Sequence, residues 1–203
     1  MDWLKPQLEQ ETPTPEQIQQ MWQTLEIQPE PCEYPAALAY MEEICLTHVN
    51  GGVVLGQFLV KGDQTLEWYA ARQSLEIIDF FDQFVCDQAV IAALPGLRIQ
   101  KPLRQQLRVE FKRSGSFTLD GELGFTLFQG GAYEQFKRSA KEAKNLAREF
   151  CDQLFSDRYD QISVYKTDLA WTEWFSDVAW DQTWFIVDRR DCRVWLLCIT
   201  DTD

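Results

Sequence analysis

The C-terminal part of the chain carries three strand-like runs, and the connections between them constrain the fold more than any other feature. The runs cover residues 161–166, 183–188 and 193–199, and Arg189-Arg190-Asp191 separates the last two. A connection this short joins antiparallel strands, so the sequence predicts a meander at the end of the chain. The regular strand–helix alternation of a doubly wound parallel sheet is missing. The predicted class is therefore α+β, with an antiparallel sheet built from hairpins and this C-terminal meander.

Helical periodicity predicts the elements that cover this sheet. Thr14-Pro15-Glu16-Gln17 is typical of a helix start, with Thr14 as the N-cap and a proline at the first helical position. A second helix is expected from about Pro35 to Asn50-Gly51-Gly52, so residues 14–50 are predicted to form a helical hairpin that could be a peripheral layer. Three to four helices in all are expected on the sheet, the later ones at residues 75–93 and 132–155.

Two hairpins are expected ahead of the last helix. The first joins residues 53–60 to residues 65–69. The second joins Phe117–Leu119 to Leu123–Phe128 across Asp120-Gly121, a dipeptide typical of tight turns. A two-residue loop would put the apolar side chains of its strands on opposite faces, so a three-residue loop with a bulge is favoured. Residues 107–111 also alternate in polarity as a strand does.

Length and composition favour one globular domain. The 203 residues are 45% hydrophobic and 13% aromatic, which excludes disorder for most of the chain. Residues 14–203 are expected to form a single domain behind a flexible polar arm, residues 1–13. Neither a signal peptide nor a membrane-spanning run is recognisable, so a cytoplasmic location with no membrane contact is expected. The six cysteines are scattered singly and are expected to be reduced.

The charge of the chain is strongly acidic but unevenly distributed. The formal net charge is −13, which argues against nucleic acid as a partner. Residues 1–97 and 149–203 are net negative, whereas residues 98–148 hold 11 basic and 5 acidic side chains. The positive middle could fold against the negative flanks, or it could form a basic face for an anionic partner. The candidates for that face recur at helical spacing: Lys137, Lys141, Lys144 and Arg148.

Tryptophan is concentrated near the C-terminus. Of the 8 tryptophans in the chain, five lie between residues 171 and 195. They could build the core, or they could line a binding surface, because indoles are enriched at binding hot spots. At least one of Trp171, Trp174 and Trp180 is expected to be partly exposed. The candidate binding residues are Trp171, Trp174, Asp177, Trp180, Asp181 and Trp184.

No motif in the chain identifies an enzyme. Asp177 and Asp181 could act as acid and base or hold a hard cation, but their spacing matches no calcium loop. Gly130-Gly131 could approach a phosphate, although a tight turn is the commoner use of such a pair. The only histidine is His48, and we expect no catalytic residue, metal site or cofactor.

Two functions remain open on the sequence alone. The preferred one is a non-enzymatic binding domain that uses the tryptophan-rich surface, residues 171–184, to neutralise or scaffold a protein partner, as acidic proteins that neutralise a basic effector do. The alternative is a small-molecule-binding domain or a carboxylate-dependent enzyme with a pocket lined by tryptophan and aspartate. The sequence fixes neither the partner nor the oligomeric state.

Overall fold

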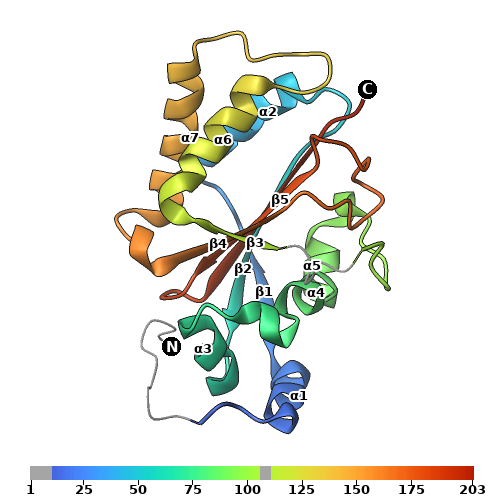
Figure 1. Ribbon diagram of the computed structural model, residues 1–203, viewed down its shortest axis with the longest axis vertical. Coiled ribbons are helices and arrows are strands. Elements are labelled where there is room, and N and C mark those ends of the chain that lie inside the picture. The colour runs from blue at the N-terminus through green and yellow to red at the C-terminus, as the bar shows by residue number, and fades with distance from the viewer. Residues whose placement is uncertain (1–10, 106–110) are drawn as a thin grey trace.

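The computed structural model describes residues 11–105 and 111–203 and has three layers (Figure 1). A six-stranded sheet is the middle layer, and helices cover both of its faces. The α+β class and the C-terminal strand meander are confirmed. Within the described ranges, no helix is long and apolar enough to cross a membrane.

All neighbouring strands of the sheet are antiparallel, in the order β1-β2-β6-β5-β4-β3. Their bounds are β1 Glu26–Glu30, β2 Gly52–Lys61, β3 Lys112–Gly115, β4 Ile162–Thr167, β5 Gln182–Asp188 and β6 Arg193–Thr200. The consecutive strands β4, β5 and β6 are the predicted meander. Strand β2 pairs with β6, so strands from both halves of the chain meet in the middle of the sheet.

Each face of the sheet has its own helical layer. One face is covered by α2 Pro35–Thr47, α6 Ser116–Gln129 and α7 Ala140–Phe155. The other is covered by α1 Pro15–Thr24, α3 Gln64–Ala71, α4 Phe80–Val85 and α5 Gln88–Ala93, with the short 3₁₀ helices η1 Leu75–Ile78 and η2 Pro95–Leu97. A further 3₁₀ turn, η4 Tyr159–Gln161, precedes β4.

The central strands are apolar on both sides because both faces are covered. Successive side chains of a strand point to opposite faces. Trp184 and Ile186 of β5 are buried under α2, α6 and α7, whereas Phe185 and Val187 are buried under the other layer. Burial on both sides explains why the meander reads as nearly continuous apolar runs instead of alternating ones.

Residues 116–129 form the single helix α6, so the predicted hairpin across Asp120-Gly121 is wrong. Leu119, Leu123 and Leu127 recur every four residues and are fully buried in the core beneath the helix. Each glycine inside a helix costs about 1 kcal/mol relative to alanine. The burial of three leucines, each worth about 1.5–3 kcal/mol, outweighs that cost.

A second feature of the sequence fits the helix better than the hairpin. A Cβ atom added to Gly124 would lie 3.1 Å from the Cα atom of Lys144 in α7. The missing side chain therefore allows α6 and α7 to approach closely. A hydrogen bond also joins α2 to α6, since the Tyr40 hydroxyl of α2 donates to the Leu123 carbonyl oxygen at 2.9 Å.

Three other expected elements differ in form. Residues 65–69 belong to α3 and not to a strand, because the Asp63 side chain caps that helix by accepting from the Thr65 backbone N–H at 2.7 Å. The predicted helix at 75–93 is divided into η1, α4 and α5. The helix expected from residue 132 begins at Ala140, where Ser139 and Glu142 form a capping box.

The N-terminal helices α1 and α2 are both present, and Thr14 and Gln17 form the predicted capping box. They do not form a hairpin. Strand β1 lies between them, and they pack on opposite faces of the sheet. The strand expected at 107–111 and the arm at 1–13 fall mostly outside the described residues.

Candidate functional site

Most of the tryptophan cluster builds the core. Trp171, Trp184 and Trp195 are essentially inaccessible to solvent. Each indole N–H still has an acceptor, as buried polar groups require. Trp171 donates to the Thr183 hydroxyl at 3.0 Å, and Trp184 donates to Glu122 at 3.1 Å. These tryptophans therefore position the sheet and offer no surface to a partner.

Two tryptophans of the connection between β4 and β5 are partly exposed, namely Trp174 and Trp180. Trp174 packs edge-on against the buried ring of Phe175, with 5.0 Å between ring centroids. At least one of Trp171, Trp174 and Trp180 was expected to be partly exposed, and both Trp174 and Trp180 are. The exposed part is limited, and neither residue lies in an open aromatic patch with Trp184.

The two candidate carboxylates of the connection have different surroundings. Asp181 is fully buried and accepts from the backbone N–H groups of Ser176, Asp177 and Val178 at 3.3, 2.6 and 3.1 Å, and from the Thr200 hydroxyl. Both oxygens are occupied, so this side chain fastens the connection to the end of β6. The carboxylate of Asp177 is exposed and lies 3.6 Å from Arg104.

The Gly130-Gly131 pair meets a carboxylate of the chain itself. Asp201, at the end of β6, is fully buried and accepts from the Asn50 N–H at 2.8 Å and the Ala132 N–H at 2.7 Å. A Cβ atom on Gly131 would lie 2.0 Å from an oxygen of Asp201. The N–H groups of Gly130 and Gly131 themselves donate to backbone carbonyl oxygens, those of Thr126 and of Thr47 and Glu134, so these amides are already paired within the chain.

The expected basic stripe lies on the α6–α7 side of the sheet. Lys141, Lys144 and Arg148 are exposed on α7, and Lys137 precedes that helix. Lys144 pairs with Asp120 at 2.7 Å and Lys137 with Glu134 at 2.6 Å. The basic residues of the 98–104 segment lie beyond α5, on the other side of the sheet, so the two groups do not form one continuous face.

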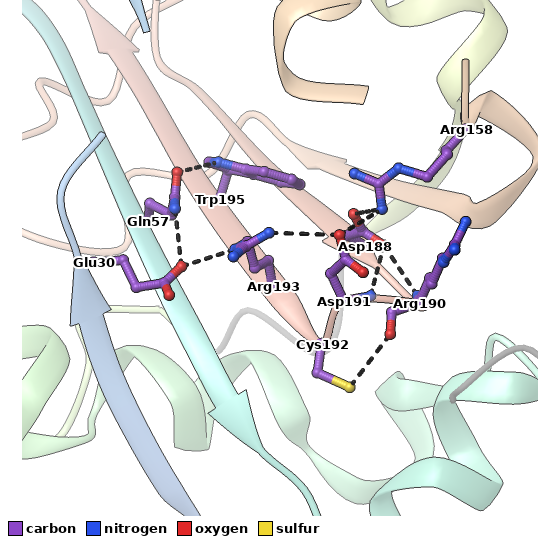
Figure 2. Close-up of polar contacts among 9 residues, drawn as sticks. All are labelled: Glu30, Gln57, Arg158, Asp188, Arg190, Asp191, Cys192, Arg193 and Trp195. Atoms are coloured by element: carbon purple, nitrogen blue, oxygen red, sulfur yellow. Dashed lines mark hydrogen bonds and ion pairs between the residues drawn. The ribbon is translucent and has the colours of Figure 1, made fainter. Parts of the chain in front are cut away.

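A polar network joins the β5–β6 turn to the edge strand β1 (Figure 2). The indole of Trp195 donates to Gln57, whose amide donates to Glu30, both at 2.9 Å. Arg193 reaches the same Glu30 oxygen at 2.8 Å. Hydrogen bonds from Arg193 and Gln57 lower the pKa of Glu30, although its partial burial opposes them.

The network continues to the buried Asp188 (Figure 2). Arg158 bridges Asp188 at 2.6 Å and Asp191 at 2.8 Å. The other oxygen of Asp188 accepts from the backbone N–H groups of Arg190 and Asp191, both at 3.0 Å. These bonds hold the turn, whereas the exposed Arg190 side chain lines a hollow of about 710 Å³ beside it.

The outer face of α6 is a candidate that the sequence did not indicate. Phe117, Phe125 and Phe128 expose 75%, 60% and 43% of their surface, and Tyr133 in the following connection exposes 65%. Large aromatic side chains usually bury most of their area. The predicted hairpin placed Phe117 and Phe125 on the buried side of strands, so the sequence did not indicate an exposed aromatic face here.

A cleft lies beside the 168–181 connection. Its volume is about 500 Å³, and its lining residues are Arg98, Gln100, Pro102, Arg104, Trp171, Thr172 and Glu173. Within the described residues, no three histidine, cysteine, aspartate or glutamate side chains gather as ligands for a metal ion. The outer face of α6 and this cleft are both open to a partner or ligand, as are two further hollows, one near Trp68 and one beside the β5–β6 turn.

No protein-family model, curated protein or solved structure matches this chain.

Proposed function

We propose that the protein is a non-catalytic binding domain that recognises a basic protein partner through the outer face of α6. The observation that carries the proposal is the exposure of Phe117, Phe125 and Phe128 on one helix. The class of function is the one that the sequence favours. The surface differs, because the tryptophans of residues 171–184 are mostly buried.

The three phenylalanines share one side of α6. At 100° per residue they fall within about 80° of one another, and they extend about 16 Å along the helix axis. The buried leucines Leu119 and Leu123 lie on the opposite side. A helix that is apolar on both sides is normally buried on both. The outer side of α6 is thus suited to be covered by another protein.

Gly121 lies at the centre of this aromatic face, between Phe117 and Phe125 in angle. Because Gly121 has no side chain, Lys144 of α7 reaches over it: a Cβ atom on Gly121 would lie 3.4 Å from the Lys144 Nζ. Aromatic rings at the centre of an interface commonly contribute 2 kcal/mol or more each on truncation, roughly. Two or three such rings are sufficient for a specific complex.

Charge favours a basic partner over a second copy of the chain. The net charge is −13, so two copies would repel each other, whereas a basic protein would be attracted. The layer that carries the aromatic face is itself acidic. Residues 35–47 and 116–155 hold eight carboxylates and five basic side chains, a balance of −3. Arg138 and Lys144, two of these bases, are already paired with carboxylates.

In the experiment, three forms of the protein are immobilised on a solid support, and each is incubated with an extract of the cell that makes the protein. The forms are the wild type, the double variant F125S/F128S and the control I77S. Ile77 is 66% exposed on η1, in the layer on the other side of the sheet, so I77S removes exposed apolar surface away from α6. Captured proteins are quantified by mass spectrometry, and the best candidate is purified and titrated.

The expected result is a lysine- or arginine-rich protein that binds the wild type and I77S equally. F125S/F128S should weaken its binding at least about 30-fold, because each truncated hot-spot ring costs roughly 2 kcal/mol at the lower end and such effects are not additive. Capture unaffected by F125S/F128S would contradict the proposal. So would dimerisation of the wild type through this face in sedimentation experiments.

A further inference from the structure

A second surface takes a different kind of ligand. The cleft beside the 168–181 connection lies between the chain that follows η2 and residues 171–173, which run side by side in Figure 1. Its volume of about 500 Å³ is within the range of small-molecule sites, roughly 300–1,000 Å³. It joins two features that are far apart in the sequence, the tryptophan-rich connection and the start of the basic segment.

The walls of the cleft are held in place by buried neighbours. Leu97 and Ile99 are buried on either side of Arg98, so the backbone that presents this arginine is anchored. The backbone N–H of Arg104 donates to the Trp171 carbonyl oxygen at 3.2 Å. Trp171 is in turn fixed by its bond to Thr183. The polar groups of the cleft are therefore presented by a backbone that is already ordered.

Two arginines, Arg98 and Arg104, line the cleft, together with one carboxylate, Glu173. Arg98 has no ion pair within the described residues, and Arg104 has one long contact, 3.6 Å, with the exposed Asp177. An exposed pair of this kind contributes little and is easily exchanged for a better partner. A guanidinium group binds a phosphate through two parallel hydrogen bonds, so a pair of arginines favours a phosphate dianion.

The other polar groups restrict the ligand further. Glu173 can accept hydrogen bonds, and Gln100 and Thr172 can both accept and donate them. Such groups suit the hydroxyl groups of a sugar. The −13 charge of the whole chain repels a long polyanion far more strongly than a single phosphate, because the polyanion carries more negative charge. We propose that this cleft binds a small phosphate monoester that also carries hydroxyl groups, such as a sugar phosphate or a nucleoside monophosphate.

The proposal is tested by calorimetric titration of the full chain with four probes: ribose 5-phosphate, adenosine monophosphate, ribose and inorganic phosphate. The same titrations are made with R98Q, with R104Q and with the control K141Q. Lys141 is exposed on α7, on the other side of the sheet, so K141Q removes the same charge from a distant surface. Circular dichroism verifies that each variant folds, which is expected because both arginines are exposed.

Saturable binding of either phosphate monoester, tighter than that of ribose or of inorganic phosphate, is the expected result. R98Q and R104Q should each raise the dissociation constant about tenfold or more, and K141Q should leave it within about twofold. Equal weakening by all three substitutions would show attraction to charge alone and would overturn the proposal. Binding of inorganic phosphate as tightly as the esters, or no saturable binding of either ester, would also overturn it.

Discussion

At the scale of single residues, three buried aspartates hold the loops around the sheet. Asp181, Asp188 and Asp201 are fully buried, and each accepts at least two backbone N–H groups from a loop. A carboxylate bonded in this way fixes the loop that donates to it. In the sequence Asp181 resembles a candidate for catalysis or metal binding, and only the fold shows that its oxygens are occupied.

We predict that Asp181→Ala destabilises the protein. The substitution leaves three backbone N–H groups and the Thr200 hydroxyl without their acceptor, and the cost should be about 2–4 kcal/mol. Asp177→Ala is the matched control, because this carboxylate is exposed and makes one weak ion pair; its effect should be below about 0.5 kcal/mol. Urea denaturation measures both, and equal effects would refute the assignment of Asp181 as a structural tie.

His48 makes the stability depend on pH. Burial lowers its pKa below 6.5, and the nearby Asp201 carboxylate opposes this only in part. Because the unfolded chain takes up the proton first, the free energy of unfolding is highest above the unfolded pKa. It decreases as the pH falls through the lowered folded value. The pKa of Glu30 lies below 4.5, so protonation of this carboxylate decreases the free energy of unfolding only at a lower pH.

We therefore predict that His48→Asn flattens this dependence. Denaturation midpoints are compared at about pH 7.5 and about pH 5.5, where the titration of a histidine dominates. The wild type should lose stability between the two values, and the variant should lose less. A variant with the same loss as the wild type would assign the pH dependence to other groups.

At the scale of elements, α6 determines both the fold of one layer and the proposed binding surface. Its buried side carries leucines at a spacing of four, and its outer side carries phenylalanines. Both stripes were visible in the sequence. The same residues also match a hairpin, because they contain the turn dipeptide Asp120-Gly121 and apolar residues at a spacing of two. The local sequence therefore does not distinguish a helix from a hairpin. Packing against α7, which is a tertiary effect, favours the helix over the hairpin.

Two glycines of α6 separate these interpretations experimentally. In the helix, a methyl group on Gly121 would meet only the flexible end of Lys144, at 3.4 Å, so Gly121→Ala should stabilise the protein by about 0.5–1 kcal/mol. Gly124→Val should destabilise it by about 1–3 kcal/mol, because its Cβ would press against the α7 backbone. Thermal unfolding followed by circular dichroism measures both. Destabilisation by Gly121→Ala would support a turn at this position.

Other elements were predictable for clear physical reasons. The meander followed from short connections between apolar runs, and α1 from a complete capping box at Thr14 and Gln17. Residues 65–69 were misassigned because a capping aspartate, Asp63, also fits a turn. The burial of Trp171 and the place of the cleft could not be predicted, since both depend on which distant segments the fold brings together.

At the scale of the whole molecule, charged side chains lie on both sides of the sheet, whereas the exposed phenylalanines lie on one side. The basic middle of the sequence is divided between the two sides of the sheet, and part of it neutralises acidic flanks, as in the pair between Arg138 and Glu43 at 2.6 Å. The acidity that remains attracts a basic partner from any direction. The exposed phenylalanines lie on one side only, so in the proposed function they determine where such a partner docks.

The most direct test of this account places a photo-reactive phenylalanine analogue at position 125 or at position 77, one on each side of the sheet. Irradiation in the native extract should cross-link position 125 to one basic protein. The yield should decrease at high salt, where long-range attraction is screened, and position 77 should give no such product. Equal products from both positions, or cross-links from position 125 only to another copy of the chain, would contradict it.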